Sequence, residues 1–412
     1  MLSLKVLKIS IFVAIGALMV FASVTILPIA EGSSIPPISL LDAQQEFPII
    51  PSITLTVCLE GPPTCDFKKI QDAINAAPET PPVRSWKEKP VIPLIKIAPG
   101  TYEENLIVLK SLWLQGAGRE RTTVIGKLEG LDAQHPTIFV AGSWHIAVGI
   151  TNLTIAGNHE AIQVVGRVSG MIVDNFIRAQ GETRVGGIWL TGAVGHLLIA
   201  QNTIMSGMNG IVLHSVVGVA DLDSPFTFLP GYGVFIVEND IQDFHFKDLS
   251  GGYGVTLHNA AKIWIAANHI HNNDTGIFLN ESKTIKIESN TLEENGSSAI
   301  WSWQSTSIDI RQNMITRNGG SGIELWSGSS INNVESNTIV SNNQDGIRSD
   351  YRPLPDLPLE IQFLRMNRIE HNQRYGINLD PQVIKLRCEA NQVSSNKKGD
   401  YSSEELRAKC GG

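Results

Sequence analysis

A short phrase, in which an asparagine closely precedes an aliphatic side chain, recurs ten times along the chain. Its asparagines are Asn152, Asn175, Asn202, Asn239, Asn268, Asn290, Asn313, Asn337, Asn367 and Asn391. Neighbouring asparagines are 22 to 37 residues apart, and the shortest separations, 22 to 24 residues, give the unit length. A fixed unit with occasional insertions is typical of a solenoid, whose units must stack because none can bury its own apolar face.

Each unit predicts three short strands. After Asn268, the apolar residues of Ile270, 276–279 and 285–287 alternate with period two. This period indicates strands with one inward face and argues against a helical repeat. The predicted fold is all-β: a right-handed parallel β-helix with three short strands per coil, an N-terminal capping helix and a short C-terminal capping helix. The asparagines are expected to form a ladder at one turn, each amide bonding to the coils above and below.

The N-terminus predicts export. Lys5 and Lys8 precede an uncharged apolar run from Ile9 to Ala30, which is typical of a signal peptide and also long enough for a membrane anchor. We therefore assign residues 1–30 to a signal peptide or anchor, 31–57 to a linker and the start of the cap, 58–400 to the β-helix and 401–412 to the C-terminal cap helix. The expected location is the periplasm, the cell surface or the exterior.

Caps are expected because a solenoid exposes strand edges and core at both ends. Asp66 predicts an N-cap for a helix that buries Ile70, Ala73 and Ile74. Ser402 with Glu405 predicts a capping box for a helix that runs through Lys409.

Four cysteines in an exported chain suggest two disulfides. Four cysteines allow three connectivities, and we favour the local pairs Cys58–Cys65 and Cys388–Cys410. A shared thiolate metal site is the competing interpretation, but neither pair has zinc-finger spacing.

The charge of the chain restricts its partners. The formal net charge is −8, so no basic patch predicts nucleic-acid binding. An overall negative field also does not attract acidic glycans, so their binding would rest on local groups.

Two stretches carry a resemblance to known proteins. The phrase P-G-x-Y-x-E at 99–104 and the glycine-rich turn at 116–118 resemble the pectin-lyase-like superfamily, and the repeats resemble NosD-type right-handed β-helix proteins. The resemblance implies the fold but no specific activity. The aspartate pair of pectin methylesterases and the N-T-D signature of polygalacturonases are missing. The D-P-H-D phrase of alginate epimerases is also missing, because Asp380-Pro381 is followed by Gln382.

The G-I-x-L strands place two columns of side chains outward. If the isoleucine and leucine point inward, the x position and the residue after the leucine point out. The first column is Trp189, Val212, Thr256, Phe278, Trp301, Glu324, Arg348 and Asn378. The second column is Thr191, His214, His258, Asn280, Trp303, Trp326, Asp350 and Asp380. Four of the eight tryptophans lie in these columns.

These columns predict a binding groove. Flat aromatic rings match the apolar faces of sugars, and an arginine fork suits hydroxyls or uronate carboxylates. The predicted substrate-binding residues are Trp189, His214, His258, Phe278, Trp301, Trp303, Trp326 and Arg348. Insertions at 179–185, 215–233, 243–252 and 350–358 would wall the groove, with Phe226, Phe228, Tyr232 and Tyr351 as lining. The alternative is that large residues simply cover their own sheet.

Three carboxylates are the catalytic candidates. Asp350 and Asp380 lie in one column, with Glu324 beside them; two carboxylates one coil apart would repel, which suits an acid and base pair. Calcium bridging two carboxylates and a uronate is another use. Solvated surface acids are the alternative.

Histidines supply a further set of candidates. His214 and His258 occupy adjacent coils and could act as a base or as ligands, and His269 and His271 form an H-x-H pair. NosD proteins are associated with copper-enzyme maturation, but no methionine or cysteine cluster joins these histidines. We therefore predict no metal site and no cofactor, with calcium as the only ion kept open.

The sequence thus predicts an exported β-helix that binds an extended polysaccharide or cell-surface glycan. Cleavage by lyase or hydrolase chemistry stays open. The alternative is a non-catalytic, NosD-like surface or periplasmic scaffold that binds a protein partner.

Overall fold

The computed structural model describes most of the chain beyond the N-terminal segment. The described residues are 50–81, 90–127, 135–157, 159–179, 186–192, 195–218, 232–245, 251–326, 328–350, 359–381, 383 and 385–411. The expected signal peptide or anchor at 1–30 lies outside them. In the described part of the chain, no helix combines the length and hydropathy needed to cross a membrane.

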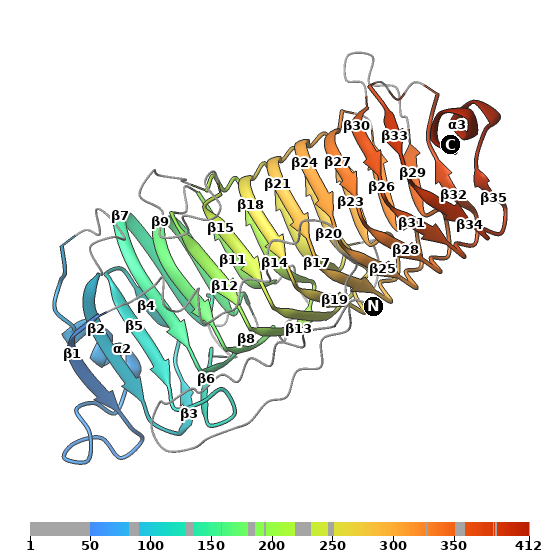
Figure 1. Ribbon diagram of the computed structural model, residues 1–412. Coiled ribbons are helices and arrows are strands. Elements are labelled where there is room, and N and C mark those ends of the chain that lie inside the picture. Colours follow the sequence, from blue (N-terminus) through green and yellow to red (C-terminus); the bar gives the residue numbers. More distant parts are fainter. Residues whose placement is uncertain are drawn as a thin grey trace, which may run out of the picture. The chain divides into compact units, whose positions relative to one another are not determined.

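Most coils consist of three short strands, as predicted. In one coil these are β20 (Thr275–Asn280), β21 (Lys283–Glu288) and β22 (Thr291–Glu293). Each pairs in parallel with its counterpart in the next coil, and Figure 1 shows the coils stacked in sequence order. The fold is a right-handed parallel β-helix.

The strands form three faces, named here after their sequence phrases. The G-I-x-L face contains β4 (Leu106–Val108), β11 (Gly186–Thr191), β14 (Asn209–His214), β17 (Tyr253–His258), β20, β23 (Ile300–Trp303), β26 (Ile323–Trp326), β29 (Ile347–Asp350), β32 (Tyr375–Asn378) and β35 (Gly399–Tyr401). The I-x-I face contains β1 (Ile50–Val57), β2 (Val91–Ile97), β5 (Leu112–Gly116), β12 (Leu197–Ala200), β15 (Val234–Val237), β18 (Ala261–Ala266), β21, β24 (Thr306–Arg311), β27 (Ser330–Glu335), β30 (Glu360–Arg365) and β33 (Arg387–Glu389). Two longer strands, β7 (Ile138–Thr151) and β9 (Ile162–Val173), run through both faces and join them into one 23-stranded sheet.

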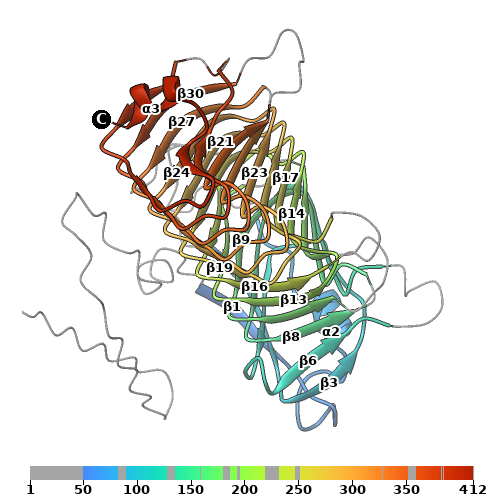
Figure 2. The same ribbon diagram turned by 90° about the vertical axis from the view of Figure 1, so that its right-hand side faces the viewer.

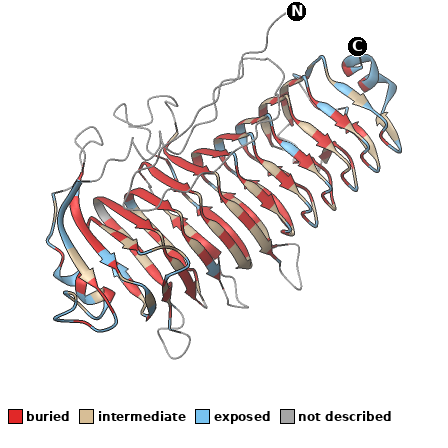
Figure 3. Ribbon diagram, turned by 60° about the horizontal axis from the view of Figure 1, so that its bottom comes forward, coloured by how far each residue is buried: buried red, intermediate tan, exposed pale blue. Residues whose placement is uncertain are grey.

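The third face, the N-x-I face, is a separate 12-stranded sheet, and Figure 2 shows several of its strands side by side. It contains β3 (Gly100–Glu103), β6 (Thr122–Ile125), β8 (Thr154–Gly157), β10 (Phe176–Ala179), β13 (Thr203–Gly207), β16 (Asp240–Phe244), β19 (His269–His271), β22, β25 (Met314–Thr316), β28 (Thr338–Val340), β31 (Arg368–Glu370) and β34 (Gln392–Ser394). Buried and partly exposed residues alternate along the strands (Figure 3), and the core is filled by isoleucine, leucine and valine.

The asparagine ladder predicted from the repeat is present. Asn290 shows its pattern: Nδ2 donates to Asn313 Oδ1 at 3.0 Å and to the Ile265 carbonyl at 2.9 Å, and the Asn290 backbone N–H also donates to Asn313 Oδ1. The residue before it, Ser289, has a φ of 56° and turns the chain. Side-chain amide bonds of this kind link Asn175 through to Asn391.

The assignment of Asn152 to this ladder is wrong. Asn152 itself occupies the left-handed turn position, with a φ of 58°, and Leu153 takes the ladder position. The Leu153 backbone N–H donates to Asn175 Oδ1 at 3.1 Å, so the ladder begins at Asn175. An asparagine suits the turn position because its short polar side chain tolerates a positive φ.

A second ladder, which the sequence analysis missed, follows the N-x-I strands. It consists of Asn273, Asn295, Asn318, Asn342, Asn372 and Asn396, all buried. From Asn273 to Asn372, each Nδ2 donates to the Oδ1 of the next member at 2.9 or 3.0 Å. Each of these asparagines stands five residues after a member of the first ladder. Two turns of every C-terminal coil are therefore fixed by stacked amides.

The N-terminal cap differs from the prediction in its first turn. The helix α2 (Ile70–Ala76) buries Ile70, Ala73 and Ile74 as expected, but its N-cap is Lys69, without a side-chain bond. Glu104 instead accepts hydrogen bonds from the backbone N–H groups of Ile70 and Gln71, at 2.8 and 3.0 Å. Asp66 accepts from the backbone and hydroxyl of Thr56. Residues 50–57, assigned to the linker and the start of the cap, form β1.

The C-terminal helix α3 (Glu404–Cys410) is capped by Ser403 rather than Ser402. Ser403 Oγ accepts from the Leu406 N–H at 3.1 Å. The Ser402 N–H is still bonded to the Ile377 carbonyl of the coil below, at 3.1 Å, so the helix begins one residue later than predicted.

Both predicted disulfides, Cys58–Cys65 and Cys388–Cys410, are present. Cys410 and Leu406 are buried, so the second disulfide and α3 together close the last coil.

We expect the Cys388→Ser/Cys410→Ser variant to lose about 3 kcal/mol of unfolding free energy, because the bond closes a loop of 22 residues. Denaturant unfolding, combined with hydrogen exchange of α3, measures this loss.

The matched control is Cys58→Ser/Cys65→Ser, whose disulfide spans seven residues. The entropic argument gives it a loss about 1 kcal/mol smaller. A larger loss at the N-terminal pair would contradict the loop-length explanation.

Candidate functional site

The strand register brings the two predicted outward columns together on the G-I-x-L face. Partners across successive strands run from Trp189 through Val212, Thr256, Phe278, Trp301, Glu324 and Arg348 to Asn378. In the second column, Thr191, His214, His258, Asn280 and Trp303 are partners, as are Trp326 and Asp350. Val212 is the one member of the two columns that is buried.

An aromatic ridge occupies the middle of this face and consists of Tyr253, Phe278, Trp301, Trp303 and Trp326. Ring centroids are 5.0 Å apart for Tyr253 and Phe278, 4.6 Å for Phe278 and Trp301, and 5.0 Å for Trp301 and Trp326. Trp303 lies 6.2 Å from Trp326 and is 36% exposed. The ridge therefore crosses four consecutive coils, and its most accessible indole is that of Trp303 on the third.

Tyr253 is a member that sequence reasoning missed. Burial, and secondly the charge of Asp274, raise the pKa of its hydroxyl. Strand alternation gives no signal for it, because a period of two assigns Tyr253, like Val255 and Leu257, to the inward set.

The ridge is followed by an arginine held between carboxylates. Arg348 Nη2 lies 3.2 Å from Asp350 Oδ2, and its Nη1 lies 3.9 Å from Glu324 Oε1. Glu324 also accepts hydrogen bonds from Trp326 Nε1 at 2.9 Å and from Ser298 Oγ at 2.6 Å. The indole, the carboxylates and the guanidinium thus form one connected network, which orients Trp326 at the end of the ridge.

Asp380 lies beside this network but outside the regular strand. The pairing of β29 with β32 covers Ile347 and Arg348 and ends at Asn378, two residues before Asp380. The Asp380 backbone N–H donates to Ser349 Oγ at 2.6 Å. The strand register therefore does not place Asp350 beside Asp380. The Asp350 carboxylate instead pairs with Arg348.

The histidines of the second column stack at the other end of the ridge. His214 and His258 have ring centroids 4.8 Å apart and planes 14° apart, and Asn280 Nδ2 lies 2.6 Å from His258 Nδ1. Trp189 is 6.4 Å from His214, and its Nε1 donates to Thr191. The predicted binding residues therefore form one continuous strip of the G-I-x-L face.

The predicted walls of this strip fall mostly outside the described residues, including Phe226, Phe228 and Tyr351. Tyr232 is described, and its placement as a wall residue is wrong. Burial raises the pKa of its hydroxyl to about 12, with Asp309 and Glu288 as the next causes. These two carboxylates belong to β24 and β21, so Tyr232 lies against the I-x-I face.

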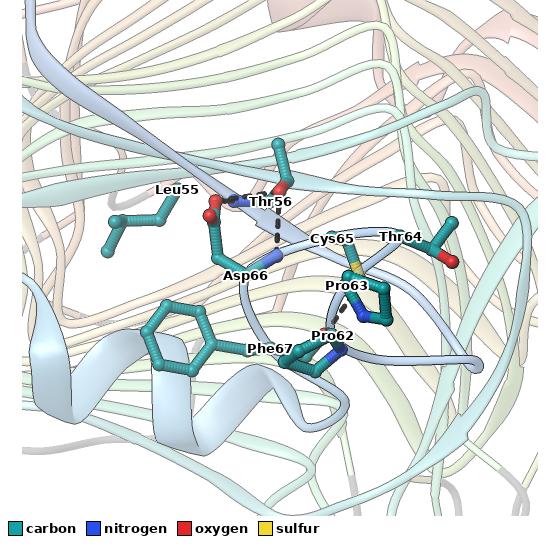
Figure 4. A pocket seen from close by; sticks show the side chains of 8 residues that line it. All are labelled: Leu55, Thr56, Pro62, Pro63, Thr64, Cys65, Asp66 and Phe67. Atoms are coloured by element: carbon teal, nitrogen blue, oxygen red, sulfur yellow. Dashed lines mark hydrogen bonds between the residues drawn. The ribbon is translucent and has the colours of Figure 1, made fainter.

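A shallow pocket of about 600 Å³ lies far from the ridge in the fold, around the loop of the first disulfide (Figure 4). It is lined by Leu55, Thr56 and residues 62–67. Its carboxylate, Asp66, points back at Thr56, whose hydrogen bonds hold the pKa of Asp66 below its usual value. The carboxylate of the pocket is thus bonded by Thr56 of β1, and we assign the pocket no ligand.

Comparisons with known proteins support the fold. Residues 186–352 match the family model described as "Right handed beta helix region". No curated protein sequence matches the chain. The A-module of the Azotobacter vinelandii mannuronan C-5 epimerase AlgE4 has a similar structure, with a TM-score of 0.59 and 14% identity over 81% of this chain and 92% of that one.

Two further solved structures are similar. The periplasmic alginate epimerase AlgG has a TM-score of 0.55 and 14% identity, over 73% of this chain and 76% of that one. The Dettilon tailspike protein has a TM-score of 0.56 and 15% identity, over 78% of this chain and 64% of that one. With the observed coil geometry, these findings show that the chain has the right-handed parallel β-helix fold.

Proposed function

We propose that the protein is exported and binds an extended polysaccharide along the G-I-x-L face. The observation that carries this proposal is the aromatic ridge over four consecutive coils. At about 4.8 Å per coil, the ridge extends for about 14 Å, which is long enough to contact several sugar units of one chain. Aromatic rings in a row offer flat apolar surfaces to successive sugar faces, and the neighbouring polar side chains supply hydrogen bonds to hydroxyls.

The comparisons favour a glycan over other ligands. Two structural neighbours are named for action on mannuronan or alginate, and this chain shares their fold. Epimerase chemistry is not part of the proposal, because the D-P-H-D phrase is absent and Gln382 follows Asp380-Pro381. The two disulfides, together with the periplasmic neighbour, support export.

Charge at the end of the ridge favours a neutral glycan. Arg348 is shared between Glu324 and Asp350, and Asp380 adds a further carboxylate nearby. An acidic polymer would therefore meet net negative charge here, unless a cation such as Ca²⁺ bridged a uronate to these oxygens. Glu324, Asp350 and Asp380 are also the carboxylates available for acid and base chemistry.

The test is incubation of residues 31–412 with neutral glycans, pectate and alginate, each with and without Ca²⁺. Affinity electrophoresis measures binding, and ultraviolet absorbance and reducing-end assays measure cleavage. We expect retardation by at least one neutral glycan. New reducing ends without unsaturation would assign hydrolysis to Glu324, Asp350 and Asp380, whereas unsaturated ends would assign β-elimination to His214, His258 and Arg348.

Folded protein that binds no glycan, yet captures one stoichiometric protein partner, would replace the proposal by a scaffold function. In that case the ridge would be a protein-docking surface.

A further inference from the structure

Two histidines and an aspartate converge on the N-x-I face, away from the aromatic ridge. Asp240 begins β16, and His269 and His271 are the ends of β19 on the next coil. The register places Asp240 beside His269 and Glu293 of the following coil beside His271. Residues i and i+2 of a strand share one face, so both imidazoles project outward together.

Their ligand atoms lie at distances that suit a single metal ion. Asp240 Oδ1 is 3.5 Å from His269 Nδ1 and 3.0 Å from His271 Nε2. The two rings stack with centroids 4.0 Å apart, and all three ligand atoms lie within 4.8 Å of one another. A tetrahedral Zn²⁺ with bonds of about 2.0–2.1 Å sets its ligand atoms about 3.3 Å apart, so the triad needs little rearrangement.

Neighbouring side chains orient two of these ligands. His269 Nε2 lies 2.8 Å from Glu293 Oε1, and Glu293 in turn pairs with Arg317. A ring proton shared with Glu293 leaves the Nδ1 lone pair directed at the position of the ion, an arrangement found behind most metal-bound histidines. Gln242 Nε2 donates to Asp240 Oδ2 at 3.3 Å, which leaves Oδ1 for the ion.

We propose that Asp240, His269 and His271 bind a divalent first-row transition metal of the Zn²⁺ type. The side chains are 40%, 44% and 22% exposed, so an ion can enter and keep a water in its fourth position. Two imidazole ligands disfavour Ca²⁺ and Mg²⁺, which prefer oxygen. With Asp240 on one coil and both histidines on the next, the bound ion would join adjacent coils. This differs from the sequence prediction of no metal site, which did not place Asp240 beside the histidine pair.

The experiment is a Zn²⁺ titration of metal-free protein, without a polyhistidine tag, by calorimetry and chelator competition. We expect one Zn²⁺ per chain, no displacement by excess Ca²⁺, and a Zn²⁺-dependent rise in melting temperature. Because loss of a group behind a ligand weakens metal binding by about 10–100-fold, His269→Ala and His271→Ala should each lose at least about 100-fold and Glu293→Gln about 10-fold.

The matched control is His371→Ala, which removes an exposed histidine from a turn in a distant coil. It should bind Zn²⁺ as the parent does. Equal binding by the parent and by both triad variants would overturn the proposal. Absence of binding by the folded parent would also overturn it, and would leave these contacts as an ordinary surface ion-pair network.

Discussion

Asn313→Ala is expected to lower the free energy of unfolding by about 2–6 kcal/mol. Asn313 Oδ1 accepts two hydrogen bonds from Asn290, one from its backbone N–H and one from its Nδ2, at 3.0 Å each. Both donors belong to a buried residue, and each would lose its acceptor at a cost of about 1–3 kcal/mol. The Ile287 carbonyl would also lose the Nδ2 of Asn313. Guanidinium unfolding at constant slope measures the change.

The matched control is Asn343→Ala, which removes an exposed asparagine one residue after the second-ladder member Asn342. We expect it to stay within about 0.5 kcal/mol of the parent. Asn318→Ala, in the second ladder, should resemble Asn313→Ala, because Asn318 Oδ1 accepts the same two bonds from Asn295. Similar small losses at all three positions would show that the ladders contribute little and that isoleucine stacking alone fixes the coils.

The structure of each coil could be predicted from the sequence because the pattern that determines it is local. Alternation within each short strand specifies which side chains enter the core, and the period specifies how often the chain returns. The second ladder was equally visible, since Asn273 follows Asn268 by five residues and the same spacing recurs in the next five coils. The N-x-I phrase covers only the asparagine before the strand, whereas the second ladder stands after it.

The N-terminal cap was less predictable because its partner is distant in sequence. Asp66 has the right residue type for an N-cap, but Thr56 on β1 takes its carboxylate. The first N–H groups of α2 are instead bonded by Glu104, 34 residues from Ile70. Such a contact depends on how the first coil closes, which no local pattern expresses.

For the candidate site, the sequence predicted which residues line the two columns but not which side chains contact one another. Register alone places Trp301 beside Phe278 and Glu324. That Glu324 bonds the Trp326 indole, or that Asp380 leaves the strand, depends on side-chain rotamers and on where β32 ends. The triad of the N-x-I face was missed similarly, because Asp240 precedes His269 by a 29-residue coil that contains an insertion.

Trp303→Ala is expected to weaken polysaccharide binding about 30-fold while leaving the fold intact. Trp303 is the most accessible member of the ridge. One face of an indole offers roughly 80 Å² to a sugar, half of the lower estimate for a buried aromatic side chain, which corresponds to about 2 kcal/mol. Trp326→Ala should cost at least as much affinity, because it also removes the hydrogen bond that holds Glu324. Calorimetry with the glycan that the panel identifies measures both.

Met314→Ala separates this prediction from a general surface effect. Met314 is 46% exposed on β25 of the N-x-I face, so its loss removes apolar surface without touching the ridge. It should bind the glycan as the parent does. If Trp303→Ala and Met314→Ala bind equally well, the ridge covers its own sheet and the glycan lies elsewhere. If Trp303→Ala alone loses affinity, with an unchanged unfolding midpoint, the exposed indole contacts the sugar directly, since the fold is as stable as in the parent.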